Sequence, residues 1–181
     1  RYPFPFMDKN RPDHGEPKKN ILLEPLSPAD RKPVIDIVNY YIENSFAAYP
    51  EHKVSYDFFD LLLKMTEGYP ALVVKEERME VVGFGMLHAY HPLPVFSKTA
   101  EISYVIKPDW INKGIGKRIL KHLTQKAEEK GITSLLASIS SLHKLSIHFH
   151  KKNGFRECGR FEKIGEKKGQ VFDVIYMQKN L

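Results

Sequence analysis

Two glycines and two lysines stand where a β-rich run gives way to a helical pattern, in the sequence Asn112-Lys113-Gly114-Ile115-Gly116-Lys117. Glycines allow the backbone to approach a ligand closely. The unpaired N–H groups of a first helical turn and the helix dipole favour negative charge at that point. The lysine ammonium groups and the Arg118 guanidinium add positive charge there. These residue types in this order predict a cradle for a pyrophosphate group.

Two other phosphate-binding loops do not fit this stretch. The dinucleotide fingerprint G-x-G-x-x-G needs a third glycine where the chain has Ile119. The P-loop needs Ser or Thr after its lysine, and Arg118 follows Lys117.

The cradle would lie between a strand at residues 102–106 and a helix that Gly131 ends, whose apolar face is Ile115, Ile119, Leu120, Leu123 and Ala127. From these residues alone, an ordinary loop-to-helix turn remains the alternative.

Histidines near the end of the chain raise the question of a metal site. Metal ligands on one helix face are typically four residues apart, whereas His143, His148 and His150 are separated by five, two and seven residues. We therefore expect no metal there. Cys158 lies in a predicted strand without an evident base beside it, so we expect a buried core thiol rather than a nucleophile.

Composition is ordinary for a soluble globular chain. The 181 residues are 42% hydrophobic and 28% charged, with a net charge of +6 and one cysteine. This length suits one domain. The positive residues are scattered, which argues against a nucleic-acid partner, and an anionic cofactor explains the excess equally well. No apolar run reaches membrane-spanning length, and the cysteine usage fits a reducing cytoplasm, so we expect a cytoplasmic protein without a membrane partner.

The order of the predicted elements sets the fold class. Residues 1–20 are predicted to form an irregular arm, with a disordered tail as the alternative, and residues 21–181 a single domain. Helices are expected after a cap at Ser27–Asp30, from Ser55, from Ile115 and at 143–152; strands are expected at 21–26, 71–75, 81–90, 99–106, 134–139, 155–161 and 171–178. This order predicts an α/β (α+β) fold, a mixed sheet with helices on both faces.

Motifs spaced along the chain resemble one enzyme family. Gly114 and Gly116 match the acetyl-CoA motif [Q/R]-x-x-G-x-[G/A] of the GNAT superfamily of N-acetyltransferases, with Ile111 at the Gln/Arg position. A downstream signature of that superfamily is matched by Ser146, His150, Gly154 and Phe155. Residues of the phosphinothricin acetyltransferase-like subfamily are matched in segment 37–42, in Thr99-Ala100-Glu101, and in Gly165, Lys167, Phe172 and Asp173. The resemblance covers residues 21–181 and implies the GNAT fold and a homodimer.

The resemblance also implies where acetyl-CoA, the co-substrate, would bind. Its pantetheine would bond to the backbone of Tyr104, Val105 and Ile106 like a short extra strand, and an N–H near Val105 would stabilise the tetrahedral oxyanion. Its pyrophosphate would lie on residues 112–117. Ser146 would hydrogen-bond CoA, and His143, at the position of the signature's Asn, is assigned to the same cofactor site.

Two residues are candidates for proton transfer. Glu101 stands where the subfamily keeps a general base, and a partly dehydrated carboxylate has a raised pKa that suits it to deprotonate an amine, directly or through water. The alternative is a strand-edge glutamate in a salt bridge. His150 would donate a proton to the leaving thiolate or position the sulfur. The alternative for it is a capped surface histidine.

The resemblance implies acetyl transfer to the primary amine of a small molecule. Many relatives carry Arg and Tyr before T-[AV]-E, where this chain has Pro94 and Phe96. A cation for an acidic substrate is therefore lost locally, unless Lys98 replaces it, and herbicide-like amino acids become doubtful as substrates. The alternatives are acetylation of a peptide or protein amine or a polyamine, and a non-catalytic acyl-CoA-binding sensor.

Overall fold

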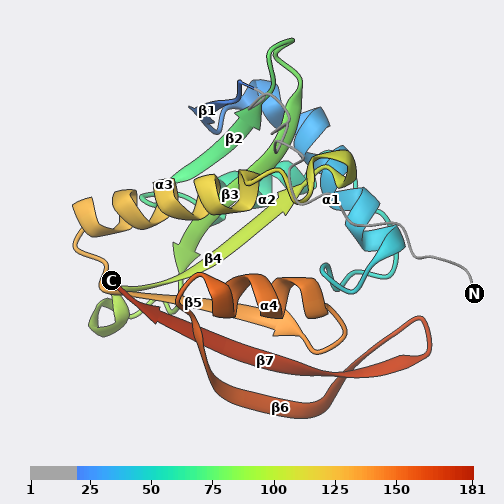
Figure 1. Cartoon of the computed structure of the whole chain (residues 1–181), viewed down its shortest axis with the longest axis vertical. Helices are drawn as coiled ribbons and strands as arrows, with labels where there is room; N and C mark the ends of the chain where they lie inside the picture. The colour runs from blue at the N-terminus through green and yellow to red at the C-terminus, as the bar shows by residue number, and fades with distance from the viewer. Residues whose placement is uncertain (1–19) are drawn as a thin grey trace, which may run out of the picture.

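Seven strands form one sheet, in the order β1-β2-β3-β4-β5-β7-β6 (Figure 1). A computed structural model of the chain describes residues 20–181, so the arm predicted at residues 1–20 lies outside the described residues except for Asn20. The strands are β1 (Leu22–Pro25), β2 (Ala71–Lys75), β3 (Val81–Ala89), β4 (Thr99–Ile106), β5 (Ser134–Ser140), β6 (Arg156–Lys167) and β7 (Gln170–Asn180). All neighbours pair antiparallel except β4 and β5, which are parallel.

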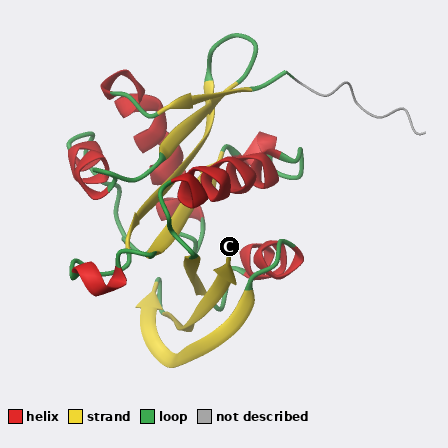
Figure 2. Cartoon of the chain, turned by 90° about the vertical axis from the view of Figure 1, so that its left-hand side faces the viewer, coloured by secondary structure: helices red, strands yellow, loops and turns green. Residues whose placement is uncertain are grey.

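Four α-helices cover the two faces of this sheet (Figure 2). They are α1 (Arg31–Asn44), α2 (Phe58–Met65), α3 (Ile115–Glu129) and α4 (Lys144–Lys152). Apolar residues of α1 and α2 pack in one buried cluster, and those of α3 and α4 pack in the other. The predicted order of elements and the mixed sheet with helices on both faces are confirmed.

The starts of the first two helices differ in how well the sequence predicts them. The backbone N–H and hydroxyl of Ser27 both donate to the Asp30 carboxylate, at 2.9 and 3.0 Å, which confirms the predicted capping box. The prediction that Ser55 caps the second helix is wrong. Its carbonyl accepts the Phe58 N–H in a turn at 3.1 Å, and Asp57 stands at the N-cap of α2.

Helix α3 lies close against the sheet because of one glycine. All five residues of its predicted apolar face are buried, and Gly131 ends it in the left-handed region with φ +76°. A Cβ at Gly85 of β3 would stand 2.4 Å from the Ile119 Cγ2. Only glycine at position 85 therefore allows this close contact between helix and strand.

Strands β4 and β5 separate after a short paired section. Their parallel pairing runs from Thr99 opposite Ser134 to Glu101 opposite Leu136. Beyond that point β4 continues beside β3 as far as Ile106, and β5 continues beside β7 as far as Ser140. The sheet is therefore open between the ends of its two central strands, and this opening is where the candidate site lies.

The last hairpin is longer than the sequence predicts. Strands β6 and β7 join through a turn at Lys168 and Gly169, so Gly165 lies inside β6 rather than in the turn. Strand β6 is the sheet edge and is largely exposed. The expectation of a buried Cys158 is wrong, because this residue lies on that edge strand and is exposed.

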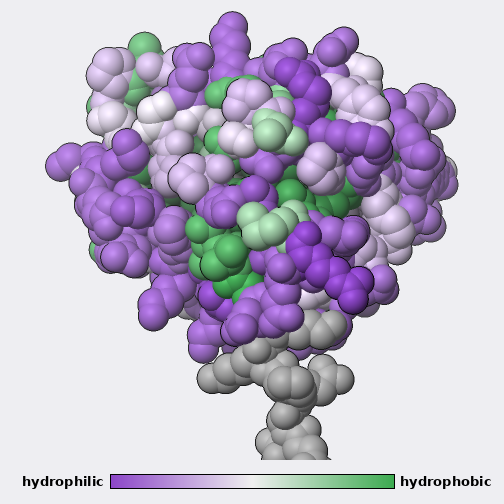
Figure 3. Space-filling model, turned by 90° about the horizontal axis from the view of Figure 1, so that it is seen from above, coloured by the Kyte–Doolittle hydropathy of each residue, from purple (hydrophilic) through white to green (hydrophobic). Residues whose placement is uncertain are grey.

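Surface character is mainly hydrophilic where the molecule is seen from above, with hydrophobic side chains showing near the middle of that face (Figure 3). Within residues 20–181, no helix has the length and apolar character needed to cross a membrane.

Candidate active site

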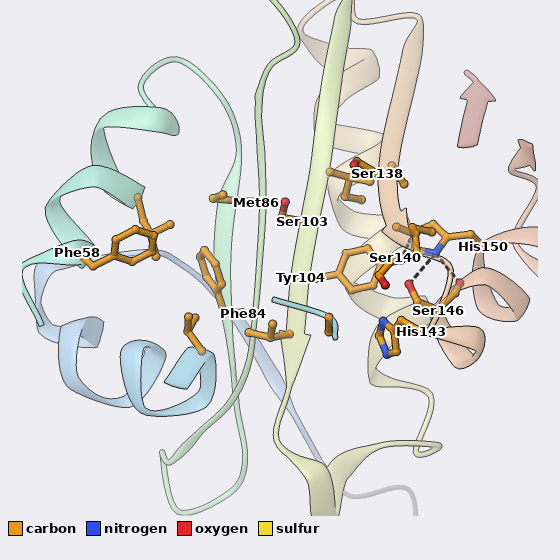
Figure 4. Close-up of a pocket in the computed structure, with 17 residues that line it drawn as sticks. Phe58, Phe84, Met86, Ser103, Tyr104, Ser138, Ser140, His143, Ser146 and His150 are labelled. Carbon is orange, nitrogen blue, oxygen red and sulfur yellow. Dashed lines mark hydrogen bonds between the residues drawn. The ribbon is translucent and has the colours of Figure 1, made fainter. Parts of the chain in front are cut away.

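A cavity of about 200 Å³ lies at the opening between β4 and β5. On one face of the sheet its wall comes from α1, α2 and β3, on the other it comes from α4, and the lining residues of β5 alternate between the two faces (Figure 4). Ser103 and Tyr104 of β4 stand between, and because side chains alternate along a strand they belong to opposite faces. The cavity therefore reaches both faces of the sheet, and two molecules could meet in it from opposite sides.

The glycine loop lies beyond the end of β4, at the start of α3. Gly114 is the N-cap in a left-handed conformation with φ +78°, and Asn112 also has a positive φ of 62°. The first intrahelical bond runs from the Arg118 N–H to the Gly114 carbonyl at 3.2 Å, so the N–H groups of residues 115–117 precede the helical ladder. The exposed Lys113 and Lys117 flank them. This geometry suits an anion.

Two residues in the first turn of α3 make contacts that the sequence does not predict. A Cβ at Gly116 would lie 3.3 Å from the Phe149 ring and 3.4 Å from the Ile106 Cδ1, so this glycine allows α3 to pack against α4 and β4. The Arg118 guanidinium donates to the Ile21 carbonyl at 3.3 Å. It therefore ties α3 to the chain before β1.

Backbone groups of β4 face the opening at alternate residues. The Lys107 N–H donates to the Val82 carbonyl of β3 at 2.8 Å. Because backbone groups alternate in direction along a strand, the N–H and C=O of Val105, two residues earlier, also point toward β3. Tyr104 and Ile106 therefore direct their N–H and C=O groups toward β5. The Tyr41 hydroxyl of α1 donates to the Ile106 carbonyl at 2.5 Å. The N–H of Val105 is therefore directed into the sheet. The backbone groups close to Val105 that face the cavity are those of Tyr104 and Ile106.

Tyr104 and His150 form a buried pair on the α4 side of the cavity. The Tyr104 hydroxyl lies 2.6 Å from His150 Nε2, and His150 Nδ1 lies 2.7 Å from the Ser146 carbonyl and 3.3 Å from its hydroxyl. A carbonyl only accepts, so Nδ1 carries the ring proton and Nε2 accepts from Tyr104. Figure 4 shows this group of side chains with His143 beside it.

Burial keeps the imidazole of His150 neutral. It lowers the His150 pKa to about 4 and also lowers the pKa of His143, while the pKa of the Tyr104 hydroxyl is raised by burial. The surface alternative for His150 is wrong, because only 3% of the residue is exposed. Both ring nitrogens are engaged, so His150 has no free proton to offer a leaving group in this arrangement.

Glu101 lies on β4 on the opposite face from Tyr104, two residues from Ser103, and is not itself part of the cavity lining. Its Oε2 is 3.5 Å from Nε2 of His88, which faces it from β3. Burial raises the Glu101 pKa, and the charge of His88 opposes that rise. A carboxylate of this kind can accept a proton from a molecule in the cavity, directly or through water.

His88 is a partner for Glu101 that sequence reasoning missed. Its Nδ1 lies 3.0 Å from the Ala89 carbonyl, so that nitrogen carries a proton and Nε2 faces Glu101 as an acceptor when the ring is neutral. A proton taken up by Glu101 would therefore lie between two acceptors. Since His88 and Glu101 pair across two antiparallel strands, only a correct strand register could have revealed the contact.

Comparison with known proteins identifies the family. The profile of the Acetyltransferase (GNAT) family matches residues 34–155. The chain belongs to the GNAT acetyltransferase family. An L-methionine sulfoximine/L-methionine sulfone acetyltransferase of Pseudomonas paraeruginosa is 31% identical over 84% of this chain and 90% of its own length.

Solved structures of two other acetyltransferases are similar to this chain. A phosphinothricin acetyltransferase from Sinorhizobium meliloti, in complex with AcCoA, has a TM-score of 0.84 and 28% identity over 89% of this chain and 88% of that one. A ribosomal-protein-alanine N-acetyltransferase from Brucella melitensis has a TM-score of 0.82 and 30% identity, covering 88% and 99% of the two chains. The expected GNAT fold and resemblance are therefore confirmed.

In this GNAT chain, the segment between α1 and α2 is fastened over the Glu101 side of the sheet. Lys167 of β6 is 1% exposed, and its ammonium donates to the carbonyls of Ile42, Ser45 and Ala48 at 2.7, 2.9 and 2.6 Å. Burial lowers the Lys167 pKa. The motif residue Lys167 thus holds the end of α1 and the segment that follows it.

An aromatic contact supports the same segment. The Tyr49 ring stacks on Phe172 of β7, with centroids 5.6 Å apart. A Cβ at Gly165 would stand 2.3 Å from the Phe172 Cζ, so the glycine leaves room for that ring. Burial raises the Tyr49 pKa, and a hydrogen bond with the Ser138 side chain of β5 opposes that rise, so the Tyr49 hydroxyl reaches a residue that lines the cavity. Sequence reasoning missed Tyr49 because nothing local distinguishes it.

Proposed function

We propose that this chain transfers the acetyl group of acetyl-CoA to the primary amine of a small molecule. The observation that carries the proposal is the cavity that reaches both faces of the sheet between β4 and β5. On one side lie the anion-binding loop and α4, and on the other lies Glu101. An enzyme that holds a thioester and an amine in line gains much of its rate from that alignment.

The cofactor side uses the residues expected from the sequence. The backbone of Asn112, Lys113, Gly114, Ile115, Gly116 and Lys117 would bind the pyrophosphate, with the two lysines completing the charge. The N–H groups of Tyr104 and Ile106 would bond the pantetheine and stabilise the oxyanion, while Val105 keeps β4 in the sheet. His143 and Ser146, at the start of α4, would complete the wall beside the thioester.

Glu101 is the general base in this proposal. Its raised pKa suits it to take the proton that an alkylammonium must lose before attack. Nitrogen then attacks the thioester carbon, the C–S bond breaks as the tetrahedral intermediate collapses, and the nitrogen, positively charged after the attack, gives up its second proton to water. The CoA sulfur leaves as a thiolate.

His150 has a positioning role in this proposal. A thiol with a pKa near about 8.5 leaves readily as a thiolate, so a strong acid is unnecessary. His150 accepts a hydrogen bond from the Tyr104 hydroxyl and so fixes the phenol ring at the cavity wall. Tyr104→Phe should therefore lower kcat about as much as His150→Ala, with a smaller effect of either on the affinity for CoA.

We also propose a homodimer in the cytoplasm. The long exposed edge strand β6 and the exposed apolar residues of this hairpin, Phe161, Ile164 and Val171, support self-association. The single cysteine fits a reducing compartment. Light scattering during size-exclusion chromatography measures the mass directly, and a monomer at micromolar concentration would contradict the dimer.

Rival functions within the fold make different demands. A peptide or protein amine needs an open groove, and the Brucella relative is named for such an acceptor, but a cavity of about 200 Å³ favours a small molecule. A non-catalytic acyl-CoA sensor would bind CoA without turnover. Thiol release from acetyl-CoA across a panel of amines, with calorimetry of CoA binding, separates these. Glu101→Gln should abolish turnover and keep CoA binding; unchanged turnover would remove Glu101 from its role.

A further inference from the structure

Apart from Ser103 and Ser138, the wall of the cavity on the acceptor side is apolar. Six of its residues are hydrophobic and come from α1, α2, β3 and the segment between the helices: Val38, Ala47, Phe58, Leu62, Phe84 and Met86. Figure 4 shows Phe58, Phe84 and Met86 on the same side of β4. Two aromatic rings and a thioether favour an aromatic or thioether group of a ligand through burial and ring contacts.

No cation serves this wall within residues 20–181. None of the 17 residues that line the cavity is lysine or arginine. The nearest lysines of the β6–β7 hairpin are already bound, Lys167 by three carbonyls and Lys168 by the Glu43 carbonyl. Lys98 lies in the turn before β4, where its carbonyl accepts the N–H groups of Thr133 and Ser134, and it is not part of the cavity lining.

The segment before β4 is apolar as well. Phe96 packs edge-on against Tyr90 and His91, with ring centroids 5.6 and 5.0 Å apart, and Pro94 begins the short 3-10 helix that presents it. Neither of these contacts brings a lysine or arginine to the place where the sequence lacks a cation.

We propose, on the basis of the acetyl transfer proposed above, that the acceptor is a small primary amine with an apolar aryl or thioether body and no carboxylate. A carboxylate on the acceptor would lose its hydration against this wall without gaining a cation. It would also lie near the carboxylate of Glu101, and like charges repel. The amine itself is the one group that Glu101 attracts. This acceptor differs in chemistry from the amino acids for which the Pseudomonas relative is named.

Matched pairs of compounds test the inference on the full chain. We would compare kcat/KM, by thiol release from acetyl-CoA at one pH, for 2-phenylethylamine against L-phenylalanine and for 3-(methylthio)propylamine against L-methionine. We expect each decarboxylated amine to exceed its amino acid at least 100-fold. Equal rates, or faster acetylation of the amino acids, would overturn the inference.

L-Phenylalaninamide separates charge from shape. It keeps the branch at Cα and removes the negative charge, so we expect its kcat/KM to lie within tenfold of 2-phenylethylamine. If the amide is as poor as L-phenylalanine, the branch rather than the charge is rejected, and the electrostatic argument fails.

A gain of charge gives a second test. Ser103 lines the cavity on the face of Glu101 and is exposed, so Ser103→Arg adds a guanidinium with little demand on the core. The ratio of amine to amino-acid kcat/KM should fall at least tenfold in Ser103→Arg and stay within threefold in Ser103→Met, which matches the length without the charge. An equal ratio in both variants would contradict the inference.

These outcomes are distinct from failure of the proposed function. Acetylation of L-methionine or L-phenylalanine in preference to the amines refutes the acceptor class and leaves acetyl transfer standing. No thiol release with any of these compounds, together with no calorimetric signal for CoA, refutes both.

Discussion

Replacing Lys167 by Met should loosen the segment that covers the acceptor side. The ammonium group of Lys167 donates to three carbonyls at 2.6 to 2.9 Å, and the side chain is almost fully buried. Methionine keeps the length and removes the donors, leaving the Ile42, Ser45 and Ala48 carbonyls unpaired.

The size of the effect follows from those three bonds. A hydrogen bond to a charged group contributes about 1.5–3 kcal/mol. The ammonium also loses its hydration on burial, which offsets part of the total and is the cause of its lowered pKa. We therefore expect Lys167→Met to lower the free energy of unfolding by about 2–4 kcal/mol. For a domain of this size that corresponds to a fall in Tm of roughly 5–15 °C.

Enzyme kinetics should show that the hydrogen bonds of Lys167 to this segment support binding of the acceptor amine. The segment carries Ala47, which lines the cavity, so KM for the amine should rise at least tenfold while the calorimetric Kd for CoA changes less than twofold. Lys168→Met is the matched control, because the neighbouring lysine is exposed and reaches one carbonyl. Its Tm and KM should remain near those of the parent protein. A stable Lys167→Met, or one whose CoA affinity falls as much as its amine affinity, would refute this reasoning.

Three further results are expected. The kcat/KM for one amine should fall with decreasing pH as the raised pKa of Glu101 is crossed, because the protonated carboxyl cannot accept a proton. His88→Gln removes the charge that lowers this pKa, so the acid limb of the pH profile should move to higher pH. An acid limb that does not move would exclude the contact between His88 and Glu101. Gly114→Val should weaken CoA binding at least tenfold by calorimetry. Its control is Gly131→Val, which has a similar φ of +76° at the other end of α3 and should cost similar stability while leaving CoA affinity unchanged. Equal losses of CoA affinity in the two variants would contradict a pyrophosphate site at residues 112–117. Gly165→Ala should lower the free energy of unfolding by about 1–3 kcal/mol in chemical denaturation, since its Cβ meets the Phe172 ring, and an unchanged midpoint would show that the ring yields freely.

Local sequence patterns predict a helix or strand well when its own residues determine where it forms and ends. The apolar face of α3 and its end at Gly131 depend on helical periodicity and a left-handed residue, and both are confirmed. The cap of α2 was missed because Ser55 and Asp57 are both good caps. The exposure of Cys158 could not be predicted, since an edge strand looks like a central one until its neighbours are known.

Features of the site that join distant segments were beyond sequence reasoning. Gly116 looked like an anion-binding glycine, yet its missing side chain also admits Phe149 from α4. His88 meets Glu101 only through the register of β3 and β4. Lys167 reaches carbonyls more than a hundred residues earlier in the chain, and no periodicity encodes that contact.

The gap between β4 and β5 has a kinetic consequence. Since the residues that line the cavity belong to both faces of the sheet, we expect both reactants to be bound at the same time, and double-reciprocal plots at several fixed concentrations of the second reactant should intersect rather than run parallel. A single inhibitor made by joining the CoA sulfur to an arylalkylamine through a short acyl bridge could thread this gap and occupy both sides of it at once.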